Sequence, residues 1–220
     1  MTGCCCAPSG YDELFGEKQA RKDARRYRRK GLDKAARWIV DAVREQGVEG
    51  ATVLEPGGGV GAIQLELLKA GAARSTVVEL SPSYEEEAAA LTKEAGLEER
   101  IERRLGDFAA DGVEPADVVV MHRVVCCYPD YERLLGAAAG HARHVLVFTH
   151  PPRNAVSRAF FSGGNLWMRL RGKEFRAFAH PPEALIATAR AHGFESFAFR
   201  RGGIWRGAAF ARAVDEPALR

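Results

Sequence analysis

The sequence lacks the long apolar runs, the secretory signal and the paired cysteines of membrane and extracellular proteins. No apolar run approaches the ~18 residues that a membrane-spanning helix needs. The start, MTGCCCAPSG, has no apolar signal core. The five cysteines stand as an adjacent triplet and an adjacent pair, a poor disulfide framework that favours free thiols. These absences predict a cytoplasmic protein without a membrane span.

A strong excess of charge of either sign is also missing. The chain carries 32 basic and 29 acidic side chains, for a formal net charge of +3. Such a balance makes a nucleic-acid partner unlikely for the molecule as a whole. Hydrophobic residues make up 46% of the 220 residues, which is enough for one α/β domain with a small cap. The sequence leaves the oligomeric state open.

Strand and helix patterns alternate along most of the chain. A basic helix is expected at 17–30, and an amphipathic helix follows Gly31. Ser81 and Pro82 are typical of a helix start, with the Ser81 side chain as the cap. Short apolar strands are expected near 52–54, 76–78, 101–105, 117–121 and 145–148, and the last two strands, 194–200 and 205–211, read as an antiparallel hairpin.

This alternation predicts a doubly wound α/β fold with a mostly parallel seven-stranded sheet and a C-terminal antiparallel hairpin. Residues 1–31 are expected to be a mobile tail and a basic lid helix, and residues 32–211 the sheet domain. The irregular stretch at about 149–181, rich in proline and glycine, is expected to insert a small cap, and 212–220 to be a tail.

A glycine turn follows the first strand, in the segment Val53-Leu54-Glu55-Pro56-Gly57-Gly58-Gly59-Val60-Gly61. Glycines allow a close approach of the backbone to a ligand. The spacing is neither that of a phosphate-binding loop nor that of a dinucleotide turn. Glu55, just before the turn, suits a ligand with a positive end, and S-adenosylmethionine has an ammonium group and a sulfonium.

Two further carboxylates follow the next two strands. Glu79 ends the second strand, beside Leu80, where a carboxylate can accept from ribose hydroxyls. Asp107 follows the third strand and can accept from an adenine amino group, while Phe108 can pack on the ring.

With these motifs in order, the chain resembles the class I S-adenosylmethionine-dependent methyltransferases over roughly residues 32–211. The resemblance implies S-adenosylmethionine as the cofactor and a small-molecule methyl acceptor. The cofactor-binding residues that it implies are Glu55, Gly57, Gly58, Gly59, Gly61, Glu79, Leu80, Asp107, Phe108 and His122. Pro56 departs from the small or apolar residue usual there. A basic N-terminal helix with a basic cap is also similar, more weakly, to magnesium-protoporphyrin methyltransferases.

The acceptor side is expected after the fourth and fifth strands. His122 and His150 are the candidate general bases, because imidazole titrates near neutral pH. Tyr128, Arg153 and Arg176 are the candidate acceptor-binding residues, since aromatic and cationic side chains suit an acidic or aromatic acceptor. Three alternatives stay open: His122 packed on backbone or cofactor, Tyr128 in the core, and a cap that is a solvated amphipathic helix whose arginines face water.

Three other functions also stay open. The cysteines 4–6 together with Cys126 and Cys127 would suit a thiol-assisted metalloid or thiol methyltransferase, although no C-x-x-C spacing occurs and no metal site is predicted. The basic segment 18–37 would suit an RNA-modifying enzyme. Cofactor binding without catalysis is the third. No Asn-Pro-Pro-aromatic motif occurs, which argues against adenine or glutamine as acceptors.

Overall fold

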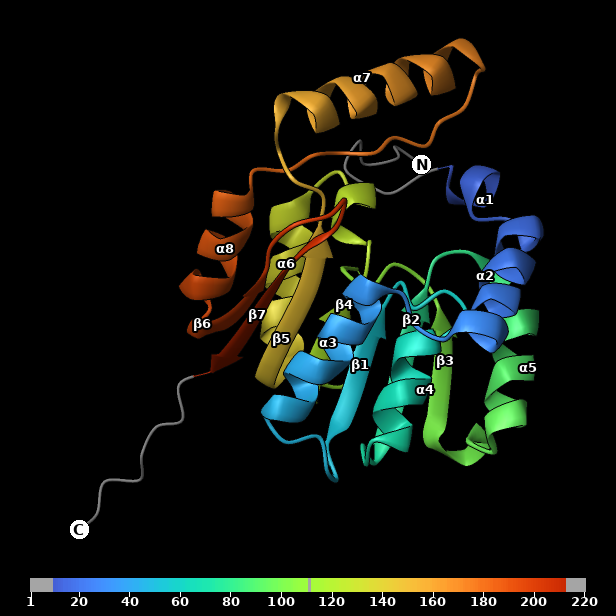
Figure 1. Cartoon of the computed structure of the whole chain (residues 1–220), viewed down its shortest axis with the longest axis vertical. Helices are drawn as coiled ribbons and strands as arrows, with labels where there is room; N and C mark the ends of the chain where they lie inside the picture. Colours follow the sequence, from blue (N-terminus) through green and yellow to red (C-terminus); the bar gives the residue numbers. More distant parts are fainter. Residues whose placement is uncertain (1–9, 111, 213–220) are drawn as a thin grey trace.

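The computed structural model describes residues 10–110 and 112–212, which fold around one seven-stranded sheet (Figure 1). The strands are β1 (Thr52–Pro56), β2 (Arg74–Glu79), β3 (Ile101–Leu105), β4 (Ala116–Met121), β5 (Ala142–His150), β6 (Phe194–Arg200) and β7 (Arg206–Arg212). Their order is β3-β2-β1-β4-β5-β7-β6. The pairs among β1 to β5 are parallel, and β7 runs antiparallel to both β5 and β6. The predicted fold class is therefore confirmed.

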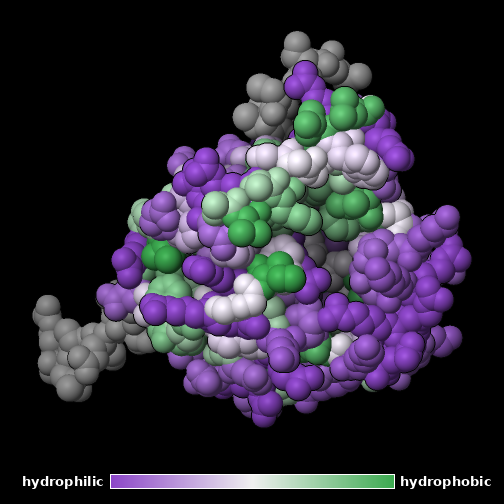
Figure 2. All heavy atoms as spheres, turned by 45° about the horizontal axis from the view of Figure 1, so that its top comes forward, coloured by the Kyte–Doolittle hydropathy of each residue, from purple (hydrophilic) through white to green (hydrophobic). Residues whose placement is uncertain are grey.

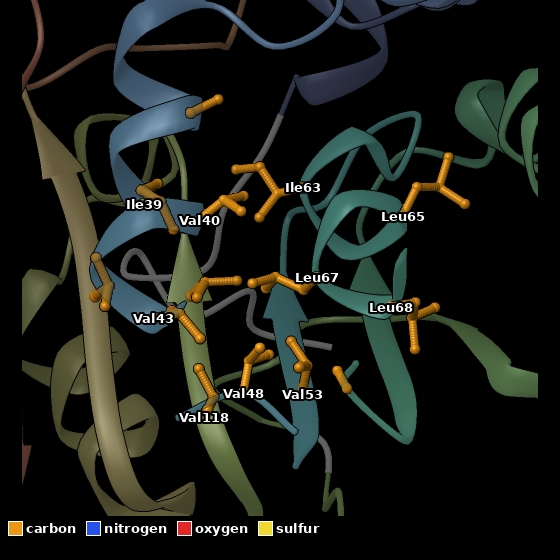
Figure 3. Close-up of a cluster of buried hydrophobic side chains, with 14 of the residues drawn as sticks. Ile39, Val40, Val43, Val48, Val53, Ile63, Leu65, Leu67, Leu68 and Val118 are labelled. Atoms are coloured by element: carbon orange, nitrogen blue, oxygen red, sulfur yellow. The ribbon is translucent and has the colours of Figure 1, made fainter. Parts of the chain in front are cut away.

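The central strands are apolar on both sides because both faces of the sheet are covered. In β4, Val118 and Val120 belong to one buried cluster, and Val119 and Met121 belong to the cluster on the opposite face. Figure 3 shows the first cluster, in which Val118 lies below side chains from two helices.

Helices cover the two faces of the sheet in separate layers. One layer contains α2 (Glu17–Lys30), α3 (Lys34–Glu45), α4 (Ala62–Lys69) and α5 (Glu85–Ala95), which bury their apolar residues in the first cluster. The other contains α6 (Tyr131–His141) and α8 (Pro182–Ala191). Three short 3-10 turns, Pro82–Tyr84, Glu98–Arg100 and Val125–Cys127, join neighbouring elements.

A short helix, α1 (Tyr11–Leu14), precedes α2 and lies above the carboxyl ends of the strands (Figure 1). It is held by Ser81, whose Oγ donates to Asp12 Oδ1 (2.6 Å) and to the Phe15 carbonyl (3.0 Å). The sequence predicts that the Ser81 side chain caps the helix that follows it, and this prediction is wrong. The Ser81 hydroxyl bonds to the N-terminal segment instead. The 3-10 turn Pro82–Tyr84 leads into α5 without a side-chain cap.

The stretch 149–181, for which the sequence leaves an irregular cap and a solvated amphipathic helix open, contains a helix of 16 residues, α7 (Ala155–Leu170). Asn154 and Ser157 form a capping box at its start. The helix lies outside both layers, at the outer edge of the molecule (Figure 1). Among the described residues, no helix is long and apolar enough to cross a membrane.

Candidate cofactor and acceptor site

A cavity of about 280 Å³ lies at the carboxyl ends of the parallel strands, below α1. Ligands of open α/β sheets bind at this edge. The structure brings nearly all of the predicted cofactor residues to this cavity: Glu55, Gly57, Gly58, Gly59, Glu79, Leu80, Asp107, Phe108 and His122 line it. Tyr128 lines it as well, whereas Gly61 does not.

The turn after β1 has a backbone that requires glycine. Gly57 and Gly59 have φ angles of +64° and +55°, which side chains disfavour. A Cβ at Gly58 would lie 3.1 Å from the Glu55 carboxyl carbon. Gly61, with φ of +79°, precedes α4, so it shapes the turn without lining the cavity. The glycines thus bring backbone, not side chains, to the cavity wall.

Glu55 is a buried carboxyl with unused hydrogen-bonding capacity. Its side chain is 2% exposed, and its Oε2 has no partner. Burial raises the pKa of Glu55 to about 8, while Arg103 opposes the shift and Glu79 adds to it. A buried carboxyl with an unpartnered oxygen, in a residue that lines the cavity, is the partner that a ligand ammonium requires. Glu55 therefore fits the methionine end of S-adenosylmethionine.

Glu79 already holds the glycine turn. Its Oε2 accepts from the Gly59 amide (2.8 Å), and its Oε1 accepts from the amides of Leu80 (2.9 Å) and Ser81 (3.1 Å). A carboxylate oxygen has two acceptor sites, so Oε2 keeps one for a ribose hydroxyl. The sequence predicts a carboxylate whose role is to bind ligand, and the structure adds that it fixes the loop around that ligand.

Asp107 is oriented by Tyr128. The Tyr128 hydroxyl donates to both carboxylate oxygens of Asp107, at 2.9 and 3.1 Å, and the Ala109 amide donates to Oδ1 at 3.0 Å. Burial, together with the Asp107 charge, raises the pKa of Tyr128. Tyr128, predicted as an acceptor residue, is thus bonded to Asp107, a predicted cofactor residue.

A charged cluster around Asp33 forms the opposite wall, and the sequence interpretation misses it. Asp33 caps α3 through Oδ1, which accepts from the amides of Ala35 and Ala36. Its Oδ2 faces Arg123 Nη2 (2.5 Å) and Arg26 Nη2 (3.4 Å). Although burial opposes the shift, hydrogen bonds from His122 and the Ala36 amide, together with the Arg123 charge, lower the pKa of Asp33. The cap position was readable from Asp33 before a helical pattern, but its reach to residues 90 positions away was not.

His122 joins this cluster through both ring nitrogens. Nδ1 lies 3.1 Å from Thr149 Oγ1, and Nε2 lies 3.4 Å from Asp33 Oδ2. Burial lowers the pKa of His122, and the Arg123 charge adds to the effect, so the ring is neutral at pH 7. Thr149 Oγ1 also accepts from the Arg123 amide, so the hydroxyl proton is best assigned toward Nδ1.

Arg123 itself has a strained backbone and a partly unused side chain. Its φ of 63° makes it the one non-glycine residue with positive φ in the described part of the chain. Such strain concentrates at functional sites. The guanidinium carbon lies 5.1 Å from the Trp205 ring centre, and the buried Nε has no partner.

Three predicted acceptor-side residues lie elsewhere. His150 is buried, and its Nδ1 lies 2.9 Å from the Pro151 carbonyl. Arg176 donates to the carbonyls of Lys173 and Phe175 in its own loop. Arg153 lines a second, surface cavity. None of the three is among the residues that line the cavity below α1.

Aromatic side chains from the N-terminal segment close the cavity from above. Tyr11, Phe15 and Tyr27 line it. The Tyr11 hydroxyl donates to the Cys127 carbonyl (2.5 Å), and Phe175 packs edge-on against both Tyr11 and Phe15. This arrangement fits the predicted lid, and it joins the lid to the loop that follows α7.

The described cysteines do not form a metal site. Cys126 and Cys127 have their sulfur atoms 3.6 Å apart, and each donates to the Arg123 carbonyl. The hydrogen bond between the two thiols and burial raise the pKa of the Cys127 thiol. Within residues 10–110 and 112–212, no group of three metal-ligating side chains occurs. Cysteines 4–6 lie outside the described residues.

Comparisons with known proteins agree with this site. Residues 54–144 match the family described as a methyltransferase domain. No curated protein sequence gives a significant match. The fold is similar to magnesium protoporphyrin IX methyltransferase from Synechocystis PCC 6803 with bound SAH, with a TM-score of 0.66, 20% identity, and coverage of 88% of this chain and 87% of that one.

Two other solved structures extend the comparison. An O-methyltransferase family protein from Burkholderia thailandensis has a TM-score of 0.66 and 20% identity, with coverage of 92% of this chain and 64% of that one. Human N-acetylserotonin methyltransferase in complex with SAM has a TM-score of 0.65 and 18% identity, with coverage of 93% and 59%.

The sheet order, the glycine turn and the matched domain agree with the fold of the class I S-adenosylmethionine-dependent methyltransferases. Residues 54–144 thus match a methyltransferase domain, and the solved structures that share this fold include magnesium protoporphyrin IX methyltransferase with bound SAH and with bound SAM. The fold of this chain also shares the resemblance to magnesium-protoporphyrin methyltransferases that its sequence suggests.

Proposed function

We propose that this methyltransferase acts on a small acidic acceptor with an aromatic or planar body, bound between the lid and the Asp33 cluster. The observation that carries the proposal is the charge of that cluster. Arg26 and Arg123 face the single carboxylate of Asp33, and His122 is neutral. One positive charge is left over beside aromatic walls, which suits an acid group on an aromatic body.

In this proposal the chain holds its cofactor with Glu55, the turn 57–59, Glu79, Leu80, Asp107 and Phe108. Bound S-adenosylmethionine supplies a methyl group that its sulfonium already activates. The remaining work of the protein is to align the acceptor and to exclude water, and such positioning accounts for a large part of a catalytic barrier. The lid residues Tyr11 and Phe15 serve the exclusion of water.

We assign His122 a positioning role in place of the general-base role expected from the sequence. With the hydroxyl proton of Thr149 toward Nδ1, the Nε2 proton faces Asp33. Neither nitrogen is then free to take a proton from an acceptor. A carboxylate acceptor is ionised at neutral pH and needs no base, so this arrangement is consistent with an acidic acceptor.

The test compares Arg123→Gln with Arg176→Gln. Methyl transfer from labelled S-adenosylmethionine is measured over a panel of aromatic carboxylates and their neutral amides. We expect Arg123→Gln to raise the KM for a carboxylate about 10-fold or more and to leave cofactor affinity within a few-fold. Arg176→Gln, which loses only bonds to its own loop, serves as the control. Equal use of carboxylates and amides by the wild type would refute an acidic acceptor.

The other functions considered from the sequence receive less support. Burial and the Cys126 contact keep the Cys127 thiol protonated, and a protonated thiol is a poor metalloid ligand. In the basic helix α2, Arg28 pairs with Glu94 and Glu87, so part of its charge is already compensated. Salt-dependent retention of RNA would favour the RNA alternative over a small acceptor.

A further inference from the structure

The helix α7 presents an apolar surface to solvent. Its large exposed side chains are Val156 (78% exposed), Phe160 (74%), Leu166 (58%), Trp167 (50%) and Leu170 (78%). None of its 16 residues is buried. Figure 1 shows α7 as the outermost element at one end of the molecule, and Figure 2 shows apolar side chains gathered at that end. Exposed apolar patches of this kind mark interaction sites.

The outward face of α7 is fixed by bonds on its inner side. Asn165 Nδ2 donates to the Ala177 carbonyl (2.8 Å), and the Ala177 amide donates to Asn165 Oδ1 (2.9 Å). Phe161 and Met168 are half-buried on that inner side. Residues 156, 160, 163, 167 and 170 recur at helical spacing and therefore share the outward face. The apolar surface is thus a built face of an amphipathic helix.

Positive charge predominates around this face. The segment 151–173 contains five cations, Arg153, Arg158, Arg169, Arg171 and Lys173, and no acidic residue. Within the described residues, none of these five forms an ion pair with a carboxylate. Arg153 and Arg158 also line the second cavity, where Arg206 adds a third cation and Glu183 a single carboxylate. The partner of this face should therefore be apolar and carry negative charge at its surface.

We propose that α7, with its flanking cations, binds the surface of an anionic lipid bilayer. A helix of this kind lies in the interface, with its Phe, Trp and Leu side chains at the acyl boundary and its Arg and Lys side chains at the phosphates. A second copy of this chain is a poorer occupant, because its own α7 would bring five more cations to the contact. This inference goes beyond the proposed function, since lipid binding requires no methyl transfer.

Binding there would place the cavity next to the membrane. The loop after α7 packs on α1, where Lys173 Nζ lies 3.4 Å from the Glu13 carbonyl and Phe175 contacts Tyr11 and Phe15. A bilayer contacting α7 therefore lies beside the lid. An acceptor dissolved in the membrane would have a short path to the cavity.

The test is cosedimentation of the full chain with vesicles of phosphatidylcholine alone and of phosphatidylcholine with phosphatidylglycerol. We expect retention on the anionic vesicles and at least a 10-fold weaker retention for Trp167→Glu. Gln46→Glu adds the same charge at an exposed position at the end of α3, away from α7, and should bind like the wild type. Phe160→Ser, which adds no charge, should also weaken binding.

Circular dichroism and binding of S-adenosylhomocysteine establish that each variant is folded. Equal retention of Trp167→Glu, Phe160→Ser and the wild type would overturn the proposal, and so would no retention of the wild type on anionic vesicles. A dimer in lipid-free buffer that Trp167→Glu dissociates, with no vesicle binding, would show that a second copy covers the face. Because these readouts do not use an acceptor, their failure leaves the proposed function untouched.

Discussion

At the scale of single residues, Glu55 couples the stability of the protein to cofactor binding. Its carboxyl is neutral in the folded protein at pH 7, because burial raises its pKa to about 8. In the unfolded chain the same group is ionised at pH 7. We propose that the native site keeps this unfavourable group in place for its ligand, a trade that is common at functional sites.

The first prediction concerns Glu55→Gln and stability. A raised folded pKa contributes full stability only below the unfolded pKa of Glu55, and this contribution is lost as pH rises toward 8. Glutamine does not ionise, so we expect the variant to be more stable than the wild type by roughly 1–3 kcal/mol at pH 8 and not at pH 5. Urea unfolding at both pH values measures the difference. A difference that does not depend on pH would contradict the assignment.

The second prediction concerns the same variant and affinity. A ligand ammonium prefers the ionised carboxylate, so binding below pH 8 must release the Glu55 proton. We expect the affinity of the wild type for S-adenosylhomocysteine to rise from pH 6 to pH 8. Glu55→Gln should bind more weakly, by about 10-fold at pH 8, and with a flatter pH profile. Calorimetry in buffers of different ionisation enthalpy checks the proton release, and parallel profiles for the two proteins would count against it.

At the scale of elements, the short helix α1 contacts three separate parts of the molecule. It touches the cavity through Tyr11, the end of β2 through Ser81, and the cap loop through Phe175. It is only four residues long, so its placement depends on these tertiary contacts and not on its own helical stability.

The third prediction is that a chain beginning at Gly16 keeps its fold and loses cofactor affinity. The sheet and its two buried clusters lie after this point, apart from the contacts of Phe15. We expect a cooperative thermal transition and about 10-fold weaker binding of S-adenosylhomocysteine. Tyr11→Phe removes only the bond to the Cys127 carbonyl, so its affinity for S-adenosylhomocysteine should lie between those of the wild type and the shortened chain. Unchanged affinity of the shortened chain would show that α1 is not a lid.

Elements also show how far the sequence could be interpreted. The strands were predictable, because glycines bound short apolar runs and both sheet faces are covered. A helix within 149–181 was one open alternative, but the bounds of α7 were not predictable, because Gly163 and Gly164 break its pattern and its apolar residues have no core to face. The cofactor residues were predictable because each follows a strand. The Asp33 cluster was not, since Arg26, Asp33, His122 and Trp205 meet only through the tertiary fold.

At the scale of the whole molecule, the cofactor should stabilise the chain as one unit. The turn after β1, Glu79 of β2 and Asp107 after β3 all line one cavity, so a ligand there bridges three strands. A ligand that binds only the folded state raises its stability by about 2.7 kcal/mol at a concentration of 100 times its Kd.

The fourth prediction follows for thermal unfolding. For a chain of this size, that gain should raise Tm by several degrees with saturating S-adenosylhomocysteine. Nicotinamide adenine dinucleotide at the same concentration should leave Tm unchanged, because the turn differs from the dinucleotide pattern. Differential scanning calorimetry compares the two. A larger shift with the dinucleotide would be incompatible with the cofactor assignment.

The contact between α1 and the loop after α7 has a consequence for the speed of the enzyme. Because one short helix contacts both the cavity and the cap, we expect release of the demethylated cofactor to require movement of this helix through the solvent. Release steps of this kind often limit turnover. We expect kcat to fall as sucrose makes the solution more viscous. The kcat of the chain that begins at Gly16 should not depend on viscosity.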